Sequence, residues 1–586
     1  MKRVFACALA GLALVFGMGT ARAACQVGKV AELPATMDGM QAMTDARING
    51  KDVRFVIDSG AFWSVISPGS ARELGLSVEP LPGWIMRGIN GEAGMSLATV
   101  KTFTISGTDI PRVQFVVAGS EVGGVGVLGQ NLLGLFDAEY DLPHGAVRLM
   151  KAKGCEKTVM TYWTAGTNRS YSVVNLLPSD QDDKQTVGIV TLNGVKIKAT
   201  FDTGSFESVL SMAAAARAGI TPKSPGVEPG GMIVGFGRKL VRTWIAPFDT
   251  FQAGDGETIH HGRIRFGEMT SDTDMLLGAD FFIAHRVYVS NSQHRLYLTY
   301  EGGPVFNLKT EHRDATGAAI ADAAPAEAPQ TAEAFSRSGA VRLARRDKDG
   351  ALADFGKAIA LAPAEPRYLL QRARAYLDAD QDEAAAADVA AAIKLKPDNV
   401  EALLARARLT LRGEDPDMAG VERDLAAAER AMAPASDDRL DLGGFYVAAN
   451  KPALAVAQYS LWIKNHPDDV RRPEAFNDRC WARALAGTEL PAALSDCNAA
   501  LRQRPGNTSI LDSRAMVELR TGDLDKAIRD YDVVIASQPE SAWSLYGRGM
   551  AKQKKGDAAG AKADFAAAAK VAPKLAARAK LLGIAP

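Results

Sequence analysis

Two stretches of this chain repeat one pattern, and that duplication constrains the fold more than any other feature. Residues 46–67 read ARINGKDVRFVIDSGAFWSVIS, and residues 190–211 read VTLNGVKIKATFDTGSFESVLS. In each stretch an Asn-Gly pair lies nine residues before an aspartate. Asn-Gly between alternating apolar runs is a strong signal for a β-hairpin. We therefore predict two strands joined by a tight turn in each stretch, leading into Asp58 and Asp202.

The similarity between the halves continues downstream of the aspartates at lower identity. Each half contains an apolar-apolar-Gly triplet, Val127-Leu128-Gly129 in the first and Leu276-Leu277-Gly278 in the second. Short helices are predicted after each aspartate stretch and after each triplet, and a hairpin closes each half. The predicted pairs are 69–75 with 212–219, 130–136 with 279–284, and 138–150 with 286–300. This ordered correspondence indicates one unit of short strands that was duplicated and fused.

Composition divides the rest of the chain, since 586 residues are too many for one core. Short Val/Ile/Phe runs separated by Gly indicate strands up to about residue 300. An Ala/Pro/Glu/Asp-rich stretch follows, as is typical of a linker, and the remainder has helical periodicity. We predict a signal peptide at 1–23, two β-rich lobes at 24–158 and 159–301, a linker at 302–331, and a helical region at 332–586.

The helical region is a tandem repeat. Prolines 363, 397, 434, 467, 505, 539 and 573 end successive segments, at spacings of 33 to 38 residues and most often 34. Before each of these prolines except Pro434, a small residue lies twelve positions earlier, as at Ala527, and a larger one eight positions earlier, as at Tyr531. This period and pattern resemble tetratricopeptide repeats. We predict an array of about seven helical hairpins, the third of them irregular.

The duplicated aspartate units resemble the active-site motifs of retropepsin-like and pepsin-like aspartic proteases. In that family Asp-Ser/Thr-Gly also follows an apolar strand, and an apolar-apolar-Gly triplet lies further along. The resemblance covers roughly residues 40–300. Together with the repeats, it makes the chain similar to bacterial retropepsin-like proteins with a tetratricopeptide tail. It implies a duplicated all-β protease-like domain of two retropepsin-like lobes, followed by an all-α repeat solenoid.

The resemblance assigns roles around the two aspartates. Asp58 and Asp202 are expected to be catalytic, since two adjacent carboxyl groups retain one proton and can activate a water between them. Ser59 and Thr203 are expected to hydrogen-bond across the two loops and fix their geometry. The neighbouring glycines, Gly60 and Gly204, are expected to leave room for backbone amides near the carboxylates. This chemistry requires neither a cofactor nor a metal.

The family also has a β-hairpin, called a flap, over the cleft of each lobe. By position the flaps are expected at 84–100 and 232–244, with tip glycines Gly88, Gly91, Gly235 and Gly237. Trp84, Phe62 and Phe206 are expected to pack in the core, and Trp63 and Glu207 to lie at the rim. The histidines, including His260 and His261, have no metal-ligand spacing and are expected on loops.

Charge and the N-terminus indicate an exported protein. Lys plus Arg equals Asp plus Glu at 68 each, so the chain has no electrostatic reason to seek nucleic acid or an anionic membrane. Lys2 and Arg3 precede an apolar run at residues 4–18, and Ala21-Arg22-Ala23 fits the small-residue rule for cleavage. The run is too short for a confident membrane span. We expect export to a bacterial periplasm, with no stable membrane span.

Four cysteines remain after the expected cleavage, and an even number in an oxidising compartment favours disulfides. Cys25 precedes the first lobe and Cys155 follows its closing hairpin. Cys480 and Cys497 fall at inward positions on the two helices of the fifth hairpin. We pair Cys25 with Cys155 and Cys480 with Cys497, with four free thiols as the alternative.

Three functions fit these observations. The first is an exported aspartic endopeptidase that holds a peptide or protein substrate in its cleft and a protein partner on the repeat groove. The second is a pseudoprotease that binds peptides without cutting them. The third is an envelope scaffold in which the repeats carry the main function. Its partner is not specified, because a fold alone does not specify a partner. The duplicated aspartates favour the first.

Overall fold

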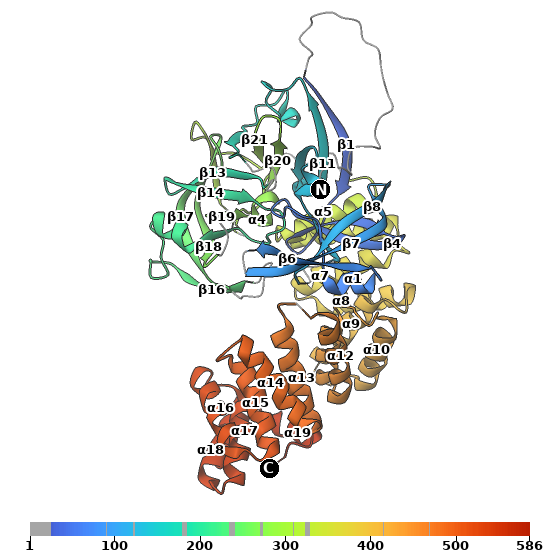
Figure 1. Cartoon of the computed structure of the whole chain (residues 1–586), viewed down its shortest axis with the longest axis vertical. Helices are drawn as coiled ribbons and strands as arrows, with labels where there is room; N and C mark the ends of the chain where they lie inside the picture. Colours follow the sequence, from blue (N-terminus) through green and yellow to red (C-terminus); the bar gives the residue numbers. More distant parts are fainter. Residues whose placement is uncertain are drawn as a thin grey trace, which may run out of the picture.

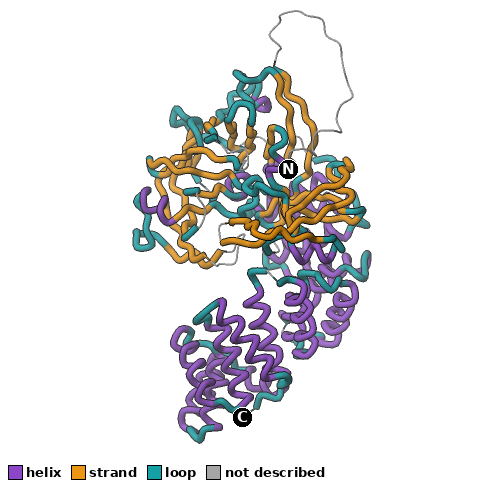
Figure 2. Tube along the Cα trace, in the orientation of Figure 1, coloured by secondary structure: helices purple, strands orange, loops and turns teal. Residues whose placement is uncertain are grey.

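The computed structural model describes residues 25–585, except 89–90, 121–123, 179–184, 234–240, 270–272, 307, 309, 323–328, 414 and 468. Two β-rich lobes come first, and a curved array of helices extends from them (Figure 1). The strands gather in the lobes and the helices in the array (Figure 2). The predicted fold class is thereby confirmed. The predicted signal peptide, residues 1–23, lies outside the described residues.

The first lobe is an eight-stranded sheet that closes on itself. Its strand order is β2-β3-β4-β9-β5-β8-β7-β6, and a further pairing of β3 with β7 completes a barrel. Three phenylalanines from β4, β7 and β8 fill its interior, with ring centroids 5.2 to 5.8 Å apart. The elements are β2 (Thr36–Asp38), β3 (Gln41–Ile48), β4 (Lys51–Ile57), β5 (Val65–Ile66), α1 (Pro68–Glu73), β6 (Val78–Gly88), β7 (Gly91–Ile105), β8 (Thr108–Val117), β9 (Gly126–Leu128) and α2 (Gln130–Leu133).

The second lobe repeats this arrangement. Its sheet has the order β16-β17-β13-β14-β19-β15-β18-β22, and β17 also pairs with β18 to close the barrel. All four predicted short helices are present, two in each lobe. The elements are β13 (Val187–Leu192), β14 (Val195–Phe201), β15 (Val209–Ser211), α3 (Met212–Arg217), β16 (Glu228–Ile233), β17 (Val241–Gln252), β18 (Glu257–Gly267), β19 (Met275–Leu277), α4 (Ala279–Phe282) and β22 (Glu311–Asp314).

The two predicted Asn-Gly turns begin the active-site strand of each lobe. Ile48 pairs with Lys51 across the first turn, and Leu192 pairs with Val195 across the second. Asn49 has a φ of 51° and Gly50 a φ of 82°, and the second turn has nearly the same values. Left-handed backbone at both central positions gives a two-residue hairpin the twist of its strands. The turn sequence therefore fixes the register of β4 and β14.

A six-stranded sheet joins the lobes, which the sequence did not reveal. The two predicted closing hairpins lie side by side in it, because β10 pairs with β20. The strand order is β1-β11-β10-β20-β21-β12. Tyr140 and Phe282 from opposite lobes pack with ring centroids 5.6 Å apart. The strands are β1 (Gln26–Pro34), β10 (Asp137–Asp141), β11 (Ala146–Lys153), β12 (Ser172–Asn175), β20 (His285–Ser290) and β21 (Arg295–Tyr300).

The segment predicted as a linker, 302–331, is partly folded into the second lobe, which corrects that prediction. Val305 and Phe306 are buried in the lobe's apolar core. β22 pairs with the edge of β18, and its His312 is 4% exposed. The sequence did not predict Val305, Phe306 and β22 as folded elements, because the composition around them is acidic and rich in alanine.

The helical region forms seven hairpins, counted over the residues that the structure describes. Five of them share a bidentate bridge from an arginine on the first helix to an aspartate on the second, as in Arg548–Asp564. The hairpins are α5 (Ala332–Ala344) with α6 (Lys348–Leu361), α7 (Pro366–Asp378) with α8 (Asp382–Leu395), α9 (Val400–Arg412) with α10 (Met418–Ala431), α11 (Arg439–Ala448) with α12 (Pro452–Asn465), α13 (Arg472–Ala486) with α14 (Leu490–Gln503), α15 (Thr508–Thr521) with α16 (Leu524–Ser537), and α17 (Ala542–Lys554) with α18 (Ala558–Val571), followed by α19 (Leu575–Leu581).

The start of the array is docked on the lobes. Val341 of α5 and Phe355 of α6 belong to the same buried apolar cluster as the lobe cores. Arg374 of α7 pairs with Asp38 of β2 at 2.8 Å. Further along, the backbone N–H of Val470 donates to the Ser120 hydroxyl at 2.8 Å. The array therefore stands in a fixed position against lobe 1 instead of hanging from a tether.

Both predicted disulfides are present. Cys25 is bonded to Cys155, with their Cα atoms 4.5 Å apart, at the far end of the six-stranded sheet. Cys480 is bonded to Cys497, with Cα atoms 5.6 Å apart, between the two helices of the fifth hairpin. The first bond ties the start of β1 to the end of lobe 1, and the second staples one repeat.

Candidate active site

Asp58 and Asp202 follow the ends of equivalent strands, β4 and β14. In each lobe that strand runs parallel to the strand of the apolar-apolar-Gly triplet, pairing Ile57 with Leu128 and Phe201 with Leu277. The backbone N–H of Asp58 donates to the Leu128 carbonyl at 3.0 Å, and that of Asp202 to the Leu277 carbonyl at 2.8 Å. The predicted triplets thus lie beside the aspartates and fix where each strand ends.

The two loops interlock through Ser59 and Thr203. The Ser59 N–H donates to the Thr203 hydroxyl at 3.0 Å, and the Thr203 N–H donates to the Ser59 hydroxyl at 2.9 Å. Each hydroxyl in turn donates to a carbonyl of the opposite lobe, Ser59 to Phe201 at 2.8 Å and Thr203 to Ile57 at 2.7 Å. Both side chains are buried. This reciprocal network is the arrangement expected for them, and it fixes the loops as one unit.

The glycines let the carboxyl groups of the two lobes meet. A Cβ atom on Gly60 would lie 2.3 Å from Cγ of Asp202, and one on Gly204 would lie 2.3 Å from Cγ of Asp58. Real Cβ atoms do not approach that closely, so any side chain here would displace the opposite carboxyl group. The expected role, room for backbone amides, is therefore only part of what these glycines do. The Asp58 and Asp202 carboxyl groups hydrogen-bond to each other.

Backbone amides hold one oxygen of each carboxyl group. The N–H groups of Gly60 and Ala61 donate to Asp58 Oδ1 at 2.9 and 2.8 Å. The N–H groups of Gly204 and Ser205 donate to Asp202 Oδ1 at 2.9 and 3.2 Å. Both carboxyl groups remain partly exposed. Each is therefore oriented by its own loop while staying within reach of a substrate.

The surroundings of the pair favour retention of one proton. Burial raises the pKa of Asp58, although the amides of Ala61 and Gly60 and a hydrogen bond with Asp202 oppose this effect. Burial raises the pKa of Asp202 well above its usual value, and the charge of Asp58 adds to the effect. Two close carboxyl groups titrate as a unit and cannot both ionise cheaply. Because the pKa of Asp202 is raised further than that of Asp58, a shared proton is favoured on Asp202 and the charge on Asp58.

A second pair of equivalent residues supports the loops from behind. In lobe 1, Oδ1 of Asn131 accepts from the N–H and hydroxyl of Ser64, each at 2.8 Å. In lobe 2, Oδ1 of Asp280 accepts from the N–H and hydroxyl of Ser208 at 2.8 and 2.7 Å. Burial raises the pKa of Asp280 to about 7, and the nearby Glu207 adds to the effect. Sequence reasoning missed both residues, although each lies two positions after the glycine of its triplet.

A hairpin suited to be a flap is present in each lobe. In lobe 1, β6 and β7 pair up to Gly88 and Gly91, the two predicted tip glycines. In lobe 2, β16 and β17 pair from Glu228 to Ile233, while Gly235 and Gly237 lie outside the described residues. Trp84 was expected in the core, but on β6 it is 55% exposed. An apolar side chain on a hairpin that has left the barrel has no core to enter.

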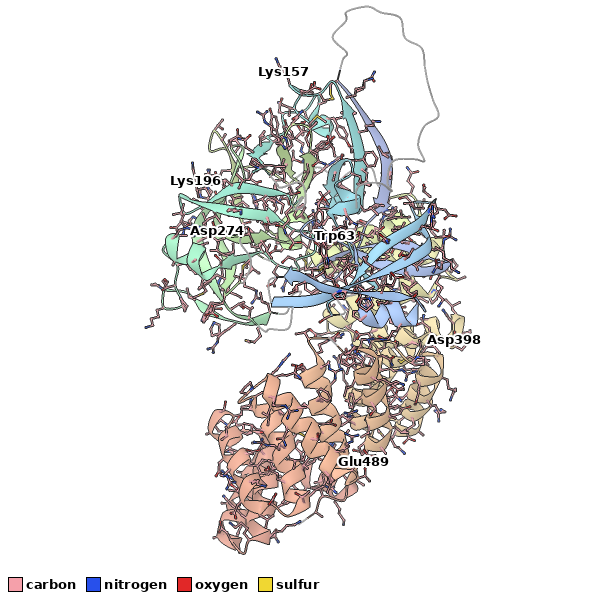
Figure 3. All side chains as sticks on the ribbon, in the orientation of Figure 1. Trp63, Lys157, Lys196, Asp274, Asp398 and Glu489 are labelled. Atoms are coloured by element: carbon pink, nitrogen blue, oxygen red, sulfur yellow. A yellow bond between two sulfur atoms is a disulfide. The ribbon has the colours of Figure 1, made fainter. Side chains whose placement is uncertain are left out.

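The aromatic residues after the aspartate triplets are also not core residues, which corrects the prediction for Phe62 and Phe206. Phe206 is 50% exposed and Phe62 is half-buried against Trp63, with ring centroids 4.7 Å apart. Trp63 is exposed, as expected of a rim residue, and lies near the meeting of the lobes in the view of Figure 3. At the matching position Glu207 binds Arg265 at 2.5 Å. One side of the site is thus apolar and the other charged.

His260 and His261 lie within strand β18, not on a loop as predicted. His260 pairs with Thr250 of β17 on one side and with Glu311 of β22 on the other, and the next residue, His261, has a left-handed φ of 56°. In the described part of the chain, no group of three or more His, Cys, Asp or Glu side chains is arranged to hold a metal ion. No helix of that part is long and apolar enough to cross a membrane.

Comparison with known proteins agrees with this geometry. A protein family described as "Aspartyl protease" matches residues 44–134 and again residues 189–281. Each match contains one aspartate triplet and one apolar-apolar-Gly triplet. Both lobes are therefore similar to the aspartyl protease family. This likeness lies within the strand-rich part of the chain, and the helical hairpins that follow form a tetratricopeptide-like solenoid.

Solved structures similar to the chain include tetratricopeptide repeat proteins and a pilus biogenesis factor. YrrB, described as having an unusual peptide-binding site, is 20% identical over 33% of this chain and 97% of its own, with a TM-score of 0.28. A repeat protein from Parabacteroides merdae is 15% identical over 44% of this chain and 99% of its own, with a TM-score of 0.34. The pilus biogenesis factor PilW is 18% identical over 35% and 92%, with a TM-score of 0.29. No curated protein matches the chain.

Proposed function

We propose that this protein is an exported aspartic endopeptidase in which Asp58 and Asp202 activate water. The observation that carries the proposal is the meeting of the two carboxyl groups across the lobes. Each glycine opens space for the opposite carboxyl group, and the Ser59–Thr203 network holds both loops. Two carboxyl groups held this close together repel each other when both are ionised, so the arrangement is not explained by stability alone.

In the proposed reaction the ionised Asp58 acts as general base. It removes a proton from a water held between the carboxyl groups as the water oxygen attacks the carbonyl carbon of the peptide bond. The protonated Asp202 donates a hydrogen bond to the oxyanion that forms. The tetrahedral intermediate then collapses, the C–N bond breaks, and the leaving nitrogen takes up a proton from the carboxyl pair. The carboxyl pair and one water supply all the protons that move.

The substrate in this proposal is an extended polypeptide under the β6–β7 hairpin. Exposed apolar side chains at the site favour a substrate with apolar side chains next to the cut bond, since an exposed apolar surface gains free energy when a ligand covers it. These side chains are Trp63, Trp84, Ile85, Phe206 and Met232. The repeats are proposed to recruit the polypeptide. The two disulfides support export to an oxidising compartment such as a periplasm.

Mutation of either aspartate tests the proposal. The mature full-length protein is incubated with an unfolded protein at pH 4 to 7, and products are identified by mass spectrometry. Asp58→Asn and Asp202→Asn should each abolish cleavage, while Asp52→Asn, an exposed change on β4, should not. Cleavage that persists in both active-site variants would refute the proposal. Binding of peptide without any cleavage by the unmutated protein would favour a pseudoprotease instead.

A further inference from the structure

Arg265 of β18 connects three separate parts of lobe 2. Its Nε donates to the Glu207 carboxylate at 2.5 Å, and its Nη1 donates to the Thr243 hydroxyl at 2.8 Å and to the Gly230 carbonyl. Glu207 lies on the active-site loop, whereas the other two acceptors belong to β16 and β17, the strands of the lobe 2 hairpin. The planar guanidinium offers several N–H donors in a fixed arrangement, so it can hold all three acceptors at once. One side chain thus joins the hairpin to the active-site loop.

The barrel itself does not require an arginine at this place. Val65 pairs with Val116 in lobe 1, and the equivalent Val209 pairs with Arg265 in lobe 2. Val116 is buried in an apolar cluster with side chains of β6 and β7, the strands of the lobe 1 hairpin. Packing therefore makes in lobe 1 the connection that hydrogen bonds make in lobe 2. Because valine satisfies the same barrel position, stability does not explain the arginine.

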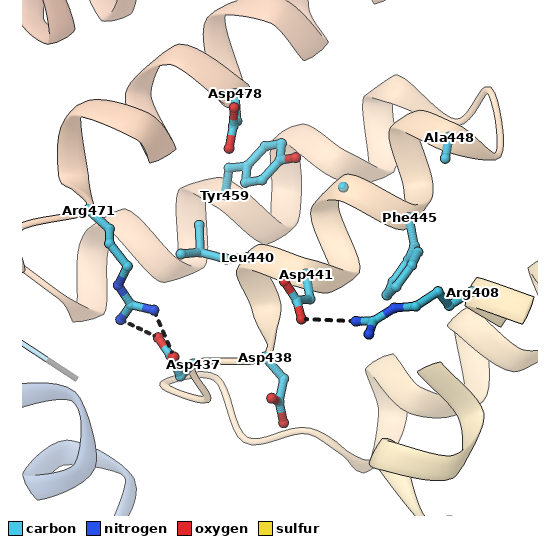
Figure 4. Close-up of a pocket in the computed structure, with 11 residues that line it drawn as sticks. Arg408, Asp437, Asp438, Leu440, Asp441, Phe445, Ala448, Tyr459, Arg471 and Asp478 are labelled. Carbon is cyan, nitrogen blue, oxygen red and sulfur yellow. Dashed lines mark hydrogen bonds and ion pairs between the residues drawn. The ribbon is translucent and has the colours of Figure 1, made fainter. Parts of the chain in front are cut away.

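The surroundings of Arg265 also differ from those of exposed arginines in the repeat array. A cavity of about 690 Å³ on the fourth helical hairpin has Arg408 and Arg471 in its wall, and each is paired with an aspartate (Figure 4). Their side chains are 52% and 33% exposed, and exposed ion pairs contribute little. The Arg265 side chain is 15% exposed. Hydrogen bonds from a charged group that is largely out of water hold their acceptors firmly in place.

The lobe 2 hairpin is shaped to receive the arginine. The register of β16 shifts between Pro229 and Gly231, so the strand bulges at Gly230. A Cβ atom on Gly230 would lie 2.8 Å from Nη1 of Arg265, and a side chain here would therefore displace the guanidinium. The Thr243 hydroxyl, which accepts from the arginine, donates to the Gly231 carbonyl at 3.1 Å and links the two strands. Both strands of the hairpin are thus held at one point.

Two exposed apolar side chains lie next to the residues that Arg265 holds. Phe206 directly precedes Glu207 on the active-site loop, and Met232 lies two residues after Gly230 on β16. A shift of the hairpin relative to the loop would move one of these side chains away from the other. The arginine therefore fixes the relative position of two apolar groups at the cleft.

We propose that Arg265 is a positioning residue that sets an apolar subsite on the lobe 2 side of the cleft, between Phe206 and Met232. On the proposed function, this subsite takes one large apolar side chain of the polypeptide substrate, such as leucine or phenylalanine. Covering apolar surface favours binding in proportion to the area covered, so the affinity depends on both walls being in place together. The subsite of lobe 2 is thus built on a charged support, whereas lobe 1 uses an apolar one.

Hydrogen exchange tests the connection itself. It is measured by mass spectrometry on the full-length Asp58→Asn protein without substrate, in peptides that cover 228–233 and 241–247. Arg265→Met keeps an unbranched stem and removes the donors, so it should raise exchange in the hairpin at least tenfold. Exchange in β14, residues 195–201, should not change. Equal loosening of β14 would show a general loss of stability and overturn the positioning role, as would an unchanged hairpin.

Peptide binding tests the subsite. Two fluorescent 15-residue peptides, one with a central phenylalanine and one with serine at that position, are compared by anisotropy on the Asp58→Asn protein. The parent should bind the phenylalanine peptide at least tenfold more tightly. Arg265→Met should reduce this ratio to about threefold or less and leave the affinity for the serine peptide unchanged. Arg265→Lys keeps the charge without the planar fork and should give an intermediate ratio.

The matched control is Lys196→Met, which removes one positive charge from an exposed position of the same lobe. It should behave like the parent in both measurements. Equal affinity for the two peptides, an unchanged ratio in Arg265→Met, or no binding of either peptide would overturn the inference. Because neither readout requires cleavage, an absence of proteolysis by the unmutated protein would refute the proposed function and leave the result for Arg265 interpretable.

Discussion

Asp280→Asn should make the second lobe more stable at neutral and alkaline pH. Asp280 occupies the position that Asn131 has in lobe 1, and both accept the same two hydrogen bonds from a serine. A neutral side chain suits this buried position, since the side chain of Asp280 is 3% exposed and no cation contacts it among the described residues. Asparagine supplies the same accepting oxygen without a charge.

The magnitude follows from the pKa of Asp280, which rises from 3.8 to about 7 in the folded lobe. The unfolded chain ionises near pH 3.8, whereas the folded lobe retains the proton to about pH 7. The stability associated with the proton is thus fully present below pH 3.8 and is lost as the pH rises to about 7. At 1.36 kcal/mol per pH unit, the ionised carboxylate costs the fold roughly 4 kcal/mol. The variant should recover up to this amount at pH 8 and little at pH 4.

Hydrogen exchange measured by mass spectrometry is the appropriate assay, because the chain has several domains and one melting temperature would mix them. Peptides that cover 201–211 should exchange more slowly in Asp280→Asn than in the parent at pH 8, and at the same rate near pH 4 after correction for intrinsic exchange. Asn131→Asp is the reciprocal control and should give lobe 1 the same pH dependence. A variant that is less protected at pH 8, or a difference that does not change with pH, would refute the reasoning.

Three further changes test other parts of the structure. Gly60→Ala places a Cβ atom 2.3 Å from Cγ of Asp202. The rate of cleavage should therefore fall on the order of 100-fold, while the free energy of unfolding changes by about 1–3 kcal/mol. Unimpaired cleavage would contradict the close approach. Glu257→Gln removes a buried carboxylate whose pKa is lowered to about 2 by His285 and His312, although burial opposes this. Hydrogen exchange of peptides that cover 257–267 should show a loss of about 3 kcal/mol at pH 6 that shrinks as the pH falls from about 4.5 towards 2, and a loss that is constant with pH would count against the prediction. Cys480→Ser with Cys497→Ser opens a loop of 17 residues and should cost the array about 3 kcal/mol in chemical unfolding, whereas no change would show that packing alone holds the fifth hairpin.

The sequence predicted most of the site because its signals are local and occur twice. Asn49-Gly50 fixes one strand register and Asn193-Gly194 the other, so Asp58 and Asp202 emerge at equivalent places. The six-stranded sheet joins strands distant in sequence, such as β10 and β20, and no local pattern encodes such a pairing. Trp84 was misplaced because an apolar residue on a flap has the same sequence pattern as one in a barrel. The edge strand β22 was missed because its residues, Glu311 to Asp314, are all polar or charged.

The docking of the first helical hairpins on the lobes has a consequence for which bonds are cut. A flexible tether would raise the local concentration of any captured chain and allow cuts at many distances. An array fixed against lobe 1 through Val341, Phe355 and the Arg374–Asp38 ion pair instead sets one path length between a captured segment and the carboxyl pair. The cleaved bond would then lie at a constant number of residues from the captured segment, so the array would select the position of the cut as well as the substrate. Peptides shorter than that span would gain nothing from the repeats.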